Sequence, residues 1–438
     1  MSLNFSSEII KLFQKKSIKM IFPEDKKAVP YLRDATFSKP EAIAVVVPQS
    51  EKELVSVVKA CADFQIQLTV RGAGTGTAGS CLPEGGILIS TEKLAGIEIH
   101  EEDFMAEVEP GAFTGDIACE AQKYGLFYPP DPASCDFSTI GGNVATNAGG
   151  PSTVGYGVTR DYVRKIRIID GRGRVMDFGG EVHKFSSSYF IPSLLCGSEG
   201  TLGVFSKIWL KLIPERPFCW YYEVSEPDFR HFSIFRKLPV TTIEYLDRGV
   251  GKLVTGVPGT FVLMKTEAVD ESSLKSFRKK IETVLNQKSY AWRSSSDKAE
   301  IWSVRSQVSP MSYSVAPVKT SQDIVLPFSQ IEDFVKWLEK FSAHYPSLTV
   351  FSYGHIGDGN LHVNIMSDEK NRFQANELQS HIMFKVREMK GMPSGEHGVG
   401  FTRKKWLQEF LSDDAMELMK NIKKNFDPHD IMNPGKIF

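Results

Sequence analysis

Residues 129–150 constrain this chain more than any other segment, because nearly every side chain after Phe137 is small. The segment reads Pro-Pro-Asp-Pro-Ala-Ser-Cys-Asp-Phe-Ser-Thr-Ile-Gly-Gly-Asn-Val-Ala-Thr-Asn-Ala-Gly-Gly. Such a run is poorly suited to building a core, but its backbone N–H groups can closely approach a flat, polar ligand. A second small-residue segment lies at residues 71–79. Two such segments favour a dinucleotide site over the simpler alternative, a glycine-rich surface loop.

The upstream segment matches the Gly-x-Gly-x-x-Gly dinucleotide fingerprint at residues 74–79. That fingerprint requires a helix that begins within it and presents its N-terminus to the pyrophosphate. Here a proline and two glycines at residues 83–86 leave no room for a helix before a predicted strand at 87–90. The sequence therefore argues against a Rossmann fold and predicts phosphate contacts from the N–H groups of a loop.

Composition excludes several classes of protein. The 52 Lys and Arg residues nearly balance the 53 Asp and Glu residues, so no basic field favours binding to nucleic acid. None of the six cysteines forms a C-x-x-C pair, which argues against disulfides, an iron–sulfur cluster and a cysteine zinc site. The absence of a signal pattern and of a membrane-length apolar run predicts a cytoplasmic protein. Peripheral contact with a membrane and a homodimer stay open.

Apolar periodicity predicts alternating helices and strands in both halves of the chain. In the first half, strands are expected at 43–47, 65–70, 87–90, 162–170, 174–178 and 202–212, and helices from Ser50 and at 114–124. In the second half, strands are expected at 242–245, 260–266, 322–326, 348–353 and 361–365, and helices at 271–285, 297–308, 328–344 and 372–390. The second half therefore reads as an α+β domain, with a boundary near Pro214.

Two histidines in the second half frame a broken strand. His355 and His362 are seven residues apart, which would place them on opposite faces of one continuous strand. Glycines at 357 and 359 interrupt the strand, so a turn can bring the two imidazoles together. His362 and Asn364 then share one face of the second strand.

Glu396 and His397 lie in a second glycine-framed segment, residues 395–400. Two histidines and a carboxylate suit a catalytic divalent ion with open coordination positions, and His397 would be available as a base. The alternative is that these are surface or core histidines without a catalytic role. Arg305 and Lys319 would suit an anionic substrate, although a solvated helix face explains Arg305 equally well.

Ordered motifs along nearly the whole chain resemble the FAD-linked oxidase family, whose FAD domain is of the vanillyl-alcohol oxidase type. The matching segments are residues 72–75, 129–132, 139–150, 197–203, 354–362, 395–400 and 433–436. The likeness is strongest to the branch that contains D-lactate dehydrogenase, the glycolate oxidase flavin subunit and D-2-hydroxyglutarate dehydrogenase.

The resemblance implies an α+β fold in three parts. These are a two-part FAD-binding domain at 1–215, an antiparallel-sheet substrate cap at 216–390, and a C-terminal segment at 391–438 that returns to the FAD domain. Because residues 78–80 offer no histidine for a covalent link, FAD is expected to be held noncovalently.

The resemblance also implies roles for individual residues. His355, His362 and Glu396 would bind a divalent metal such as zinc or manganese, and His397 would be the base. Arg305 would hold the substrate carboxylate, with help from Lys319, Ser309 and Asn364. The residues expected to contact FAD are Arg71, Gly72, Ala73, Gly74, Thr75, Gly76, Thr77, Pro130, Asp131, Pro132, Ser134, Thr139, Gly141, Gly142, Asn143, Ala145, Asn147, Gly149, Glu199, Gly203, Val204 and Asn433.

The implied reaction is oxidation of a 2-hydroxy acid, of D configuration, to the 2-oxo acid by hydride transfer to FAD. Electrons would leave to an external acceptor such as a quinone, a cytochrome or an electron-transfer flavoprotein. Three alternatives stay open: a redox-neutral alkyl transferase resembling alkylglycerone-phosphate synthase, a metal-dependent hydrolase, and a flavin-binding module without turnover.

Overall fold

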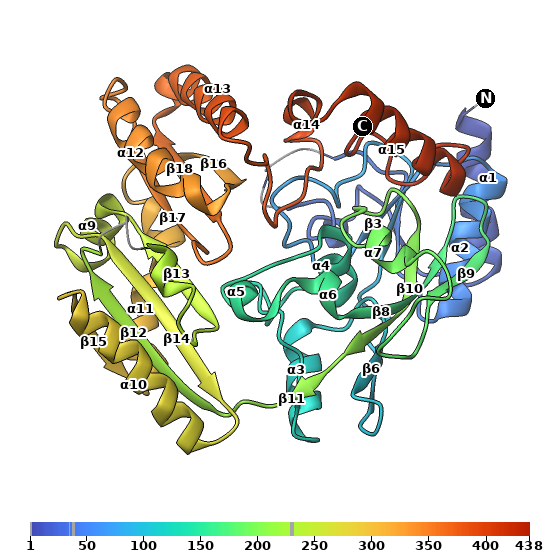
Figure 1. Ribbon diagram of the computed structural model, residues 1–438. Coiled ribbons are helices and arrows are strands. Elements are labelled where there is room, and N and C mark those ends of the chain that lie inside the picture. The colour runs from blue at the N-terminus through green and yellow to red at the C-terminus, as the bar shows by residue number, and fades with distance from the viewer. Residues whose placement is uncertain (1, 35, 37–39, 228–231) are drawn as a thin grey trace. The chain divides into compact units, whose positions relative to one another are not determined.

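A computed structural model describes residues 2–34, 36, 40–227 and 232–438 (Figure 1). The chain divides into two compact units. The first unit comprises Met1–Ala148, Val158–Pro214 and Glu396–Phe438, and the second comprises Gly149–Gly157 and Glu215–Gly395. Each unit is described by itself below.

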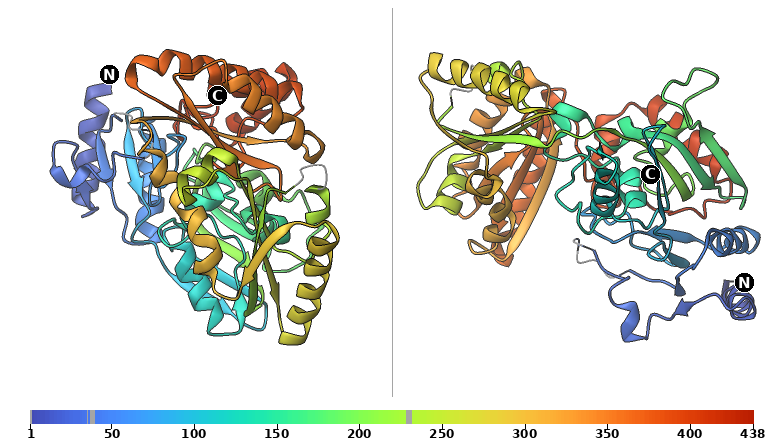
Figure 2. Two further views of the ribbon diagram at one scale, coloured as in Figure 1. Left: turned by 90° about the vertical axis from the view of Figure 1, so that its left-hand side faces the viewer. Right: turned by 90° about the horizontal axis from the view of Figure 1, so that it is seen from below.

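The first unit contains a four-stranded sheet in the order β1-β2-β4-β3. Its strands are β1 (Met20–Ile21), β2 (Ala44–Val46), β4 (Ile87–Ser90) and β3 (Leu68–Arg71), with the last three parallel. The helices α1 (Ser2–Lys15) and α2 (Glu51–Asp63) lie side by side, in blue, against this sheet (Figures 1 and 2). As predicted, Ser50 caps α2, because its side chain accepts a hydrogen bond from the Glu53 N–H.

A five-stranded antiparallel sheet forms the other part of the first unit, in the order β5-β6-β10-β8-β9. Its strands are β5 (Ile97–His100), β6 (Met105–Val108), β10 (Val204–Lys211), β8 (Val163–Ile169) and β9 (Val175–Gly179). A short pair, β7 (Leu126–Phe127) and β11 (Ile213–Pro214), and the helices α3 (Thr114–Gln122), α6 (Thr159–Tyr162) and α7 (Ile191–Leu195) complete this part. No helix starts between β3 and β4, in agreement with the argument against a Rossmann fold.

One helix, α4 (Ile140–Thr146), forms within residues 129–150 and is capped by Thr139, although this segment was judged poorly suited to building a core. Ile140 and Val144 are fully buried. Small residues on the remaining faces of α4 allow close packing, and its two apolar side chains are enough to anchor it.

The C-terminal segment of the first unit joins the four-stranded sheet. After α14 (Lys404–Phe410) and α15 (Asp413–Phe426), Met432 forms a parallel bridge with Leu68 of β3. The Leu68 N–H donates to Ile431 and the Asn433 N–H donates to Leu68, both at 2.7 Å. The end of the chain therefore extends the edge of β3 by hydrogen bonding.

The second unit is built on one antiparallel seven-stranded sheet in the order β15-β12-β14-β13-β17-β18-β16. Its strands are β15 (Ala291–Ser295), β12 (Phe218–Ser225), β14 (Phe261–Ala268), β13 (Thr242–Leu246), β17 (Thr349–Gly354), β18 (Asn360–Ser367) and β16 (Val318–Val325). Gly149–Gly157, including α5 (Thr153–Tyr156), packs with this sheet, since Tyr156 donates to Glu267 at 2.6 Å.

Helices cover both faces of this sheet (Figure 1). On one face, α9 (Arg248–Thr255) and α11 (Lys298–Ser312) pack on a cluster that includes Leu246 and Phe351. On the other, α10 (Glu271–Gln287) packs on β12 and β14, and α13 (Arg372–Glu388) packs on β16 and β18. The unit also contains α8 (Phe232–Phe235) and α12 (Ile331–Ser342). Every residue of β18 is buried, including its polar residues Asn360, His362 and Asn364.

The predicted strands and helices are present with small changes in their bounds, whereas β1, β5, β6, β7, β11, β12 and β15 were not predicted. The helix expected at 297–308 continues to Ser312 despite Pro310. Among the described residues, no helix is both long enough and apolar enough to cross a bilayer.

Candidate functional site

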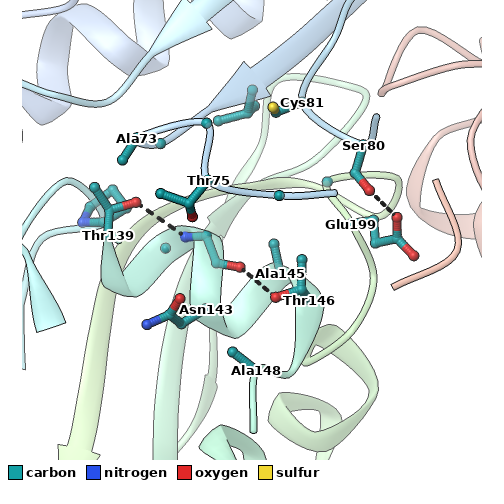
Figure 3. Close-up of a pocket in the computed structure, with 18 of the residues that line it drawn as sticks. Ala73, Thr75, Ser80, Cys81, Thr139, Asn143, Ala145, Thr146, Ala148 and Glu199 are labelled. Atoms are coloured by element: carbon teal, nitrogen blue, oxygen red, sulfur yellow. Dashed lines mark hydrogen bonds between the residues drawn. The ribbon is translucent and has the colours of Figure 1, made fainter. Parts of the chain in front are cut away.

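A cavity in the first unit is lined by the two small-residue segments found in the sequence (Figure 3). The predicted FAD-contacting residues that line it are Gly72, Ala73, Gly74, Thr75, Gly76, Thr77, Pro132, Ser134, Thr139, Gly141, Gly142, Asn143, Ala145, Glu199, Gly203 and Val204. The lining residues that were not predicted are Val70, Ser80, Cys81, Thr91, Pro110, Ala133, Thr146, Ala148, Gly200 and Phe205. Most of these adjoin predicted residues along the chain, which is the signal that could have identified them.

Glycine lets the loop at residues 72–76 lie close to its support. A Cβ atom on Gly72 would lie 2.1 Å from the Thr139 hydroxyl, and one on Gly74 would lie 1.9 Å from the Arg71 guanidinium. Gly74 also has a φ of 75°, which glycine adopts most readily. A Cβ atom on Gly76, in contrast, would meet no atom of the described part of the chain within 4 Å.

Arg71 supports this loop from behind and does not line the cavity. Its guanidinium donates hydrogen bonds to the carbonyls of Pro30 and Ala73, at 3.0 and 3.3 Å. Arg71 is 6% exposed, so these contacts satisfy a charged group that would be costly to bury unpaired. Its position favours a role in shaping the loop over direct contact with a ligand.

Glu199 is a buried carboxylate that joins three segments of the first unit. It accepts hydrogen bonds from the Ser80 hydroxyl, from the Val399 N–H at 2.7 Å and from the Gly400 N–H at 2.8 Å. Burial raises the pKa of Glu199, and these hydrogen bonds oppose that shift. Figure 3 shows the contact between Glu199 and Ser80 at the edge of the cavity.

Asn433 also connects segments of the first unit. Its side-chain amide donates to the carbonyls of Ser80 and Glu199, at 2.8 and 2.6 Å, and accepts from the Thr69 hydroxyl at 3.1 Å. The predicted FAD-contacting residues that do not line the cavity are Arg71, Pro130, Asp131, Asn147, Gly149 and Asn433. Of these, Gly149 belongs to the second unit.

The lining residues fit a large, polar, flat cofactor such as FAD. The buried Thr77 hydroxyl has no hydrogen-bond partner among the residues that the structure describes, so it can serve a bound ligand. The open space beside Gly76 and the small residues of α4 allow a ligand to contact the backbone directly. Glu396 and His397, predicted as a metal ligand and a base, line the same cavity.

His355 and His362 lie close together in the second unit, as the broken strand predicts. Their ring centroids are 5.3 Å apart, nearly perpendicular, and both residues are buried. His355 follows the end of β17 and His362 lies within β18. Each has a carboxylate facing its Nδ1: Glu244 lies 2.5 Å from His355, and Asp323 lies 3.8 Å from His362. Facing carboxylates of this kind orient metal-binding histidines.

Glu244 was not predicted, although it contacts two of the predicted residues. One carboxylate oxygen contacts His355 Nδ1 and the other accepts a hydrogen bond from Arg305 Nε, both at 2.5 Å. The side chain of Glu244 is fully buried. Burial opposes its ionisation, but the neighbouring His355 and Arg305 outweigh that effect and lower the pKa of Glu244 to about 2. A lone glutamate in an apolar strand gave no signal of these partners.

The remaining predicted substrate residues lie on the same sheet or on α11. Asn364 is fully buried and donates to the Tyr353 hydroxyl at 3.0 Å. Lys319 donates to the Ser309 hydroxyl at 3.2 Å. Arg305 lies over the Tyr353 ring, 4.9 Å from its centroid. The second unit therefore brings Arg305, Asn364 and His362 around Tyr353, places His355 beside His362, and pairs Lys319 with Ser309.

Family models match both halves of the chain. The model for a FAD binding domain matches residues 42–179, and the model for the C-terminal domain of FAD linked oxidases matches residues 233–437. The first match contains most of the cavity-lining residues, and the second contains His355, His362, Glu396 and His397.

Three curated relatives are similar along nearly their whole length. A D-lactate dehydrogenase of Anaerostipes hadrus is 32% identical over 98% of this chain and 97% of that protein. The glycolate oxidase subunit GlcD of Bacillus subtilis (strain 168) is 31% identical over 90% of this chain and 88% of its own. A D-2-hydroxyglutarate dehydrogenase of Stutzerimonas stutzeri is 30% identical over 91% of both chains.

Solved structures share the fold at low sequence identity. A p-cresol methylhydroxylase with bound substrate has a TM-score of 0.80 and 14% identity over 99% of this chain and 96% of its own. An alkyldihydroxyacetonephosphate synthase has a TM-score of 0.76 and 16% identity over 98% and 86%. The predicted α+β fold, with a two-part FAD-binding domain of this type and an antiparallel-sheet cap domain, is thereby confirmed. The two family models and the three relatives show that this chain belongs to the FAD-linked oxidase family and is a FAD-dependent oxidoreductase.

Proposed function

We propose that this protein oxidises a 2-hydroxy acid of D configuration to the corresponding 2-oxo acid. The three relatives at 30–32% identity are all named for 2-hydroxy acids: lactate, glycolate and 2-hydroxyglutarate. The observation that carries the proposal is the buried group of the second unit, in which an arginine, two histidines and two carboxylates lie together. Such a set can bind an anion and a cation.

FAD would be held noncovalently by the loop at 72–77, by α4 and its preceding segment, and by Glu199 and Val204. When bound, FAD supplies the hydride acceptor. The chain's part is to position the isoalloxazine ring and keep water from it. The small side chains of the lining and the buried hydroxyl of Thr77 suit that task.

Arg305 would bind the substrate carboxylate. A guanidinium can form two parallel hydrogen bonds to a carboxylate, which fixes both its position and its orientation. Lys319, Ser309 and Asn364 would assist, because they are polar residues of the same sheet and of α11. Orientation of this kind lowers the barrier by holding the reacting C–H bond in a productive geometry.

A divalent metal would be bound by His355, His362 and Glu396. The two histidines support this proposal, because each presents Nδ1 to a carboxylate and so directs Nε2 away from it. Zinc and manganese both accept this ligand set, and either would supply Lewis acidity toward a hydroxyl group.

His397 would remove the hydroxyl proton of the substrate at an imidazole nitrogen. Its position in the lining of the first unit's cavity supports this role. Its Nε2 lies 3.9 Å from the Glu396 carboxylate, which would stabilise the imidazolium that forms. The electrons would then pass to an external acceptor. A relative from Arabidopsis thaliana is 31% identical over 90% of this chain and 73% of its own. It is named a mitochondrial D-lactate dehydrogenase (cytochrome), and this name supports a cytochrome as one candidate acceptor.

An alkyl transferase is the second candidate, since alkyldihydroxyacetonephosphate synthase shares the fold. At 16% identity that likeness supports the fold alone, and no observation in the second unit favours alkyl transfer over oxidation.

The decisive experiment is the visible absorption spectrum of the purified protein, recorded anaerobically before and after addition of D- and L-2-hydroxy acids. Bleaching of the flavin bands by a D-acid, with formation of the 2-oxo acid, would establish cofactor and reaction together. Flavin bands that no hydroxy acid bleaches would refute the proposed reaction, and alkyl transfer without an added electron acceptor would establish the second candidate.

A further inference from the structure

Glu244 joins two residues to which different roles are assigned above. It lies on β13, near the middle of the seven-stranded sheet, and its two carboxylate oxygens serve different partners. Oε1 contacts His355 Nδ1 and Oε2 accepts from Arg305 Nε, both at 2.5 Å. The residue proposed to bind a metal and the residue proposed to bind the substrate carboxylate therefore depend on one side chain.

The chemistry of this contact fixes the orientation of the imidazole. An ionised carboxylate can only accept hydrogen bonds, so Nδ1 of His355 must carry the proton. Nε2 then holds the lone pair and points away from Glu244, as a metal ligand requires. Glu244 also holds the Arg305 side chain, which emerges from α11, against the face of the sheet beside Tyr353.

The burial of Glu244 makes this arrangement rigid. Glu244 is 0% exposed and the Arg305 side chain is 15% exposed, so neither can exchange its partner for water without a large desolvation cost. A charge-assisted hydrogen bond in such surroundings holds both partners in one geometry.

We propose that Glu244 is a positioning residue that couples the Arg305 anion site to the His355 cation site. The inference rests on the proposed function. It goes beyond that function because it states that one buried carboxylate, Glu244, orients both Arg305 and His355. Loss of the carboxylate should weaken metal binding and substrate binding together, although Glu244 itself touches neither ligand.

The same sheet offers a matched control, Glu223. Both Glu223 and Glu244 lie directly opposite Leu263, one on each side of it, and so face the same way. Glu223 is also buried and accepts two hydrogen bonds from one arginine, Arg293, at 2.8 and 2.6 Å. Arg293 lies on the edge strand β15 and its side chain is 55% exposed, and no role in ligand binding is proposed for this pair.

The test compares Glu244→Gln and Glu223→Gln in the FAD-loaded, full-length protein. After removal of metal with a chelator, the Kd for Mn²⁺ is measured by calorimetry, and KM is measured for the hydroxy acid that bleaches the wild-type flavin most effectively. For Glu244→Gln we expect the Mn²⁺ Kd to rise about 10–100-fold and KM to rise at least about tenfold. For Glu223→Gln we expect both constants to change less than about twofold.

A second variant covers the case in which Glu244→Gln does not fold. Arg305→Lys keeps a cation but shortens its reach, which should loosen Glu244 and weaken Mn²⁺ binding even though Arg305 is no metal ligand. A change in KM without any change in Mn²⁺ Kd in Arg305→Lys would contradict the coupling. So would a Glu244→Gln protein with wild-type constants, equal losses in Glu223→Gln, or a wild-type protein that binds no Mn²⁺. If no hydroxy acid bleaches the wild-type flavin, the proposed function fails, whereas the Mn²⁺ measurements still decide the coupling.

Discussion

The carboxylate of Glu199 accepts a hydrogen bond from the Val399 N–H at 2.7 Å, across 200 residues of sequence. This contact, together with that to Gly400, ties the segment after His397 to the small-residue turn at residues 197–203. Because Glu199 and His397 both line the cavity, the carboxylate helps to hold the proposed base in place.

We therefore expect Glu199→Gln to destabilise the first unit by about 1–3 kcal/mol, because the new amide must direct an NH₂ group at a backbone or hydroxyl donor. Urea unfolding monitored by flavin fluorescence would measure the loss. Glu102→Gln, at an exposed glutamate of the same unit, is the control and should be neutral. An unfolding midpoint unchanged in Glu199→Gln would show that the loop holds its position without this carboxylate.

Two neighbouring glycines should respond differently to the addition of a methyl group. Gly74→Ala should lower the thermal stability even without FAD, because Cβ would overlap the Arg71 guanidinium and φ is positive. Gly76→Ala should fold normally, since its Cβ would meet no atom of residues 2–34, 36, 40–227 and 232–438 within 4 Å, but it should bind FAD less tightly. Melting temperature and FAD Kd, measured on both apoproteins, would test this. Equal FAD affinity in Gly76→Ala and wild type would place the ligand away from Gly76.

Replacement of the proposed base should affect chemistry more than binding. His397→Asn is expected to lower turnover by about 10²–10⁴-fold, the usual contribution of a general base. The flavin content and the spectral change caused by a bound hydroxy acid should persist. His344→Asn, at an exposed histidine of the second unit, is the matched control. Full turnover in His397→Asn would assign the proton transfer to another group.

Removal of the metal should be reversible in the wild type alone. Dialysis against a chelator is expected to abolish turnover, and Mn²⁺ or Zn²⁺ should restore it. In His362→Ala the loss should persist at metal concentrations that restore the wild type, because one proposed ligand is missing. Turnover that survives in protein shown by elemental analysis to be metal-free would refute the metal site.

Asp270 should give the second unit an acid-dependent stability. It caps α10, and hydrogen bonds from Ser272 and Ser273 lower its pKa from 3.8 to about 2. Because the folded-state pKa is depressed, the stabilisation is complete above pH 4 and is lost as the pH falls toward 2. Asp270→Asn keeps a capping side chain but loses the charge. Its melting temperature should lie below that of the wild type at pH 7, and the two should converge near pH 2. A constant difference across this range would mean that the charge is irrelevant.

The local sequence determined much of the fold and the candidate site. Ser50 predicted the start of α2, the glycines at 357 and 359 predicted the break between β17 and β18, and proline and glycine at 83–86 excluded a helix after the fingerprint. These signals are local, because caps, turns and broken strands depend on residues within a few positions of one another. The small-residue segments predicted most of the cavity lining for the same reason, since close backbone approach needs small residues wherever it occurs.

Only the tertiary structure decided which distant residues meet. Glu244 lies in an apolar strand and looks like any solvent-facing glutamate, yet its partners come from α11 and from the end of β17. The pairing of Leu68 with Met432 and the place of Gly149–Gly157 in the second unit likewise have no local signal. Such contacts depend on which strands lie next to one another in a sheet. Packing across the whole unit determines this spatial order of the strands. The sequence therefore indicated the kinds of side chain available for chemistry, and tertiary packing decided that one buried carboxylate holds two of the residues proposed to bind ligands.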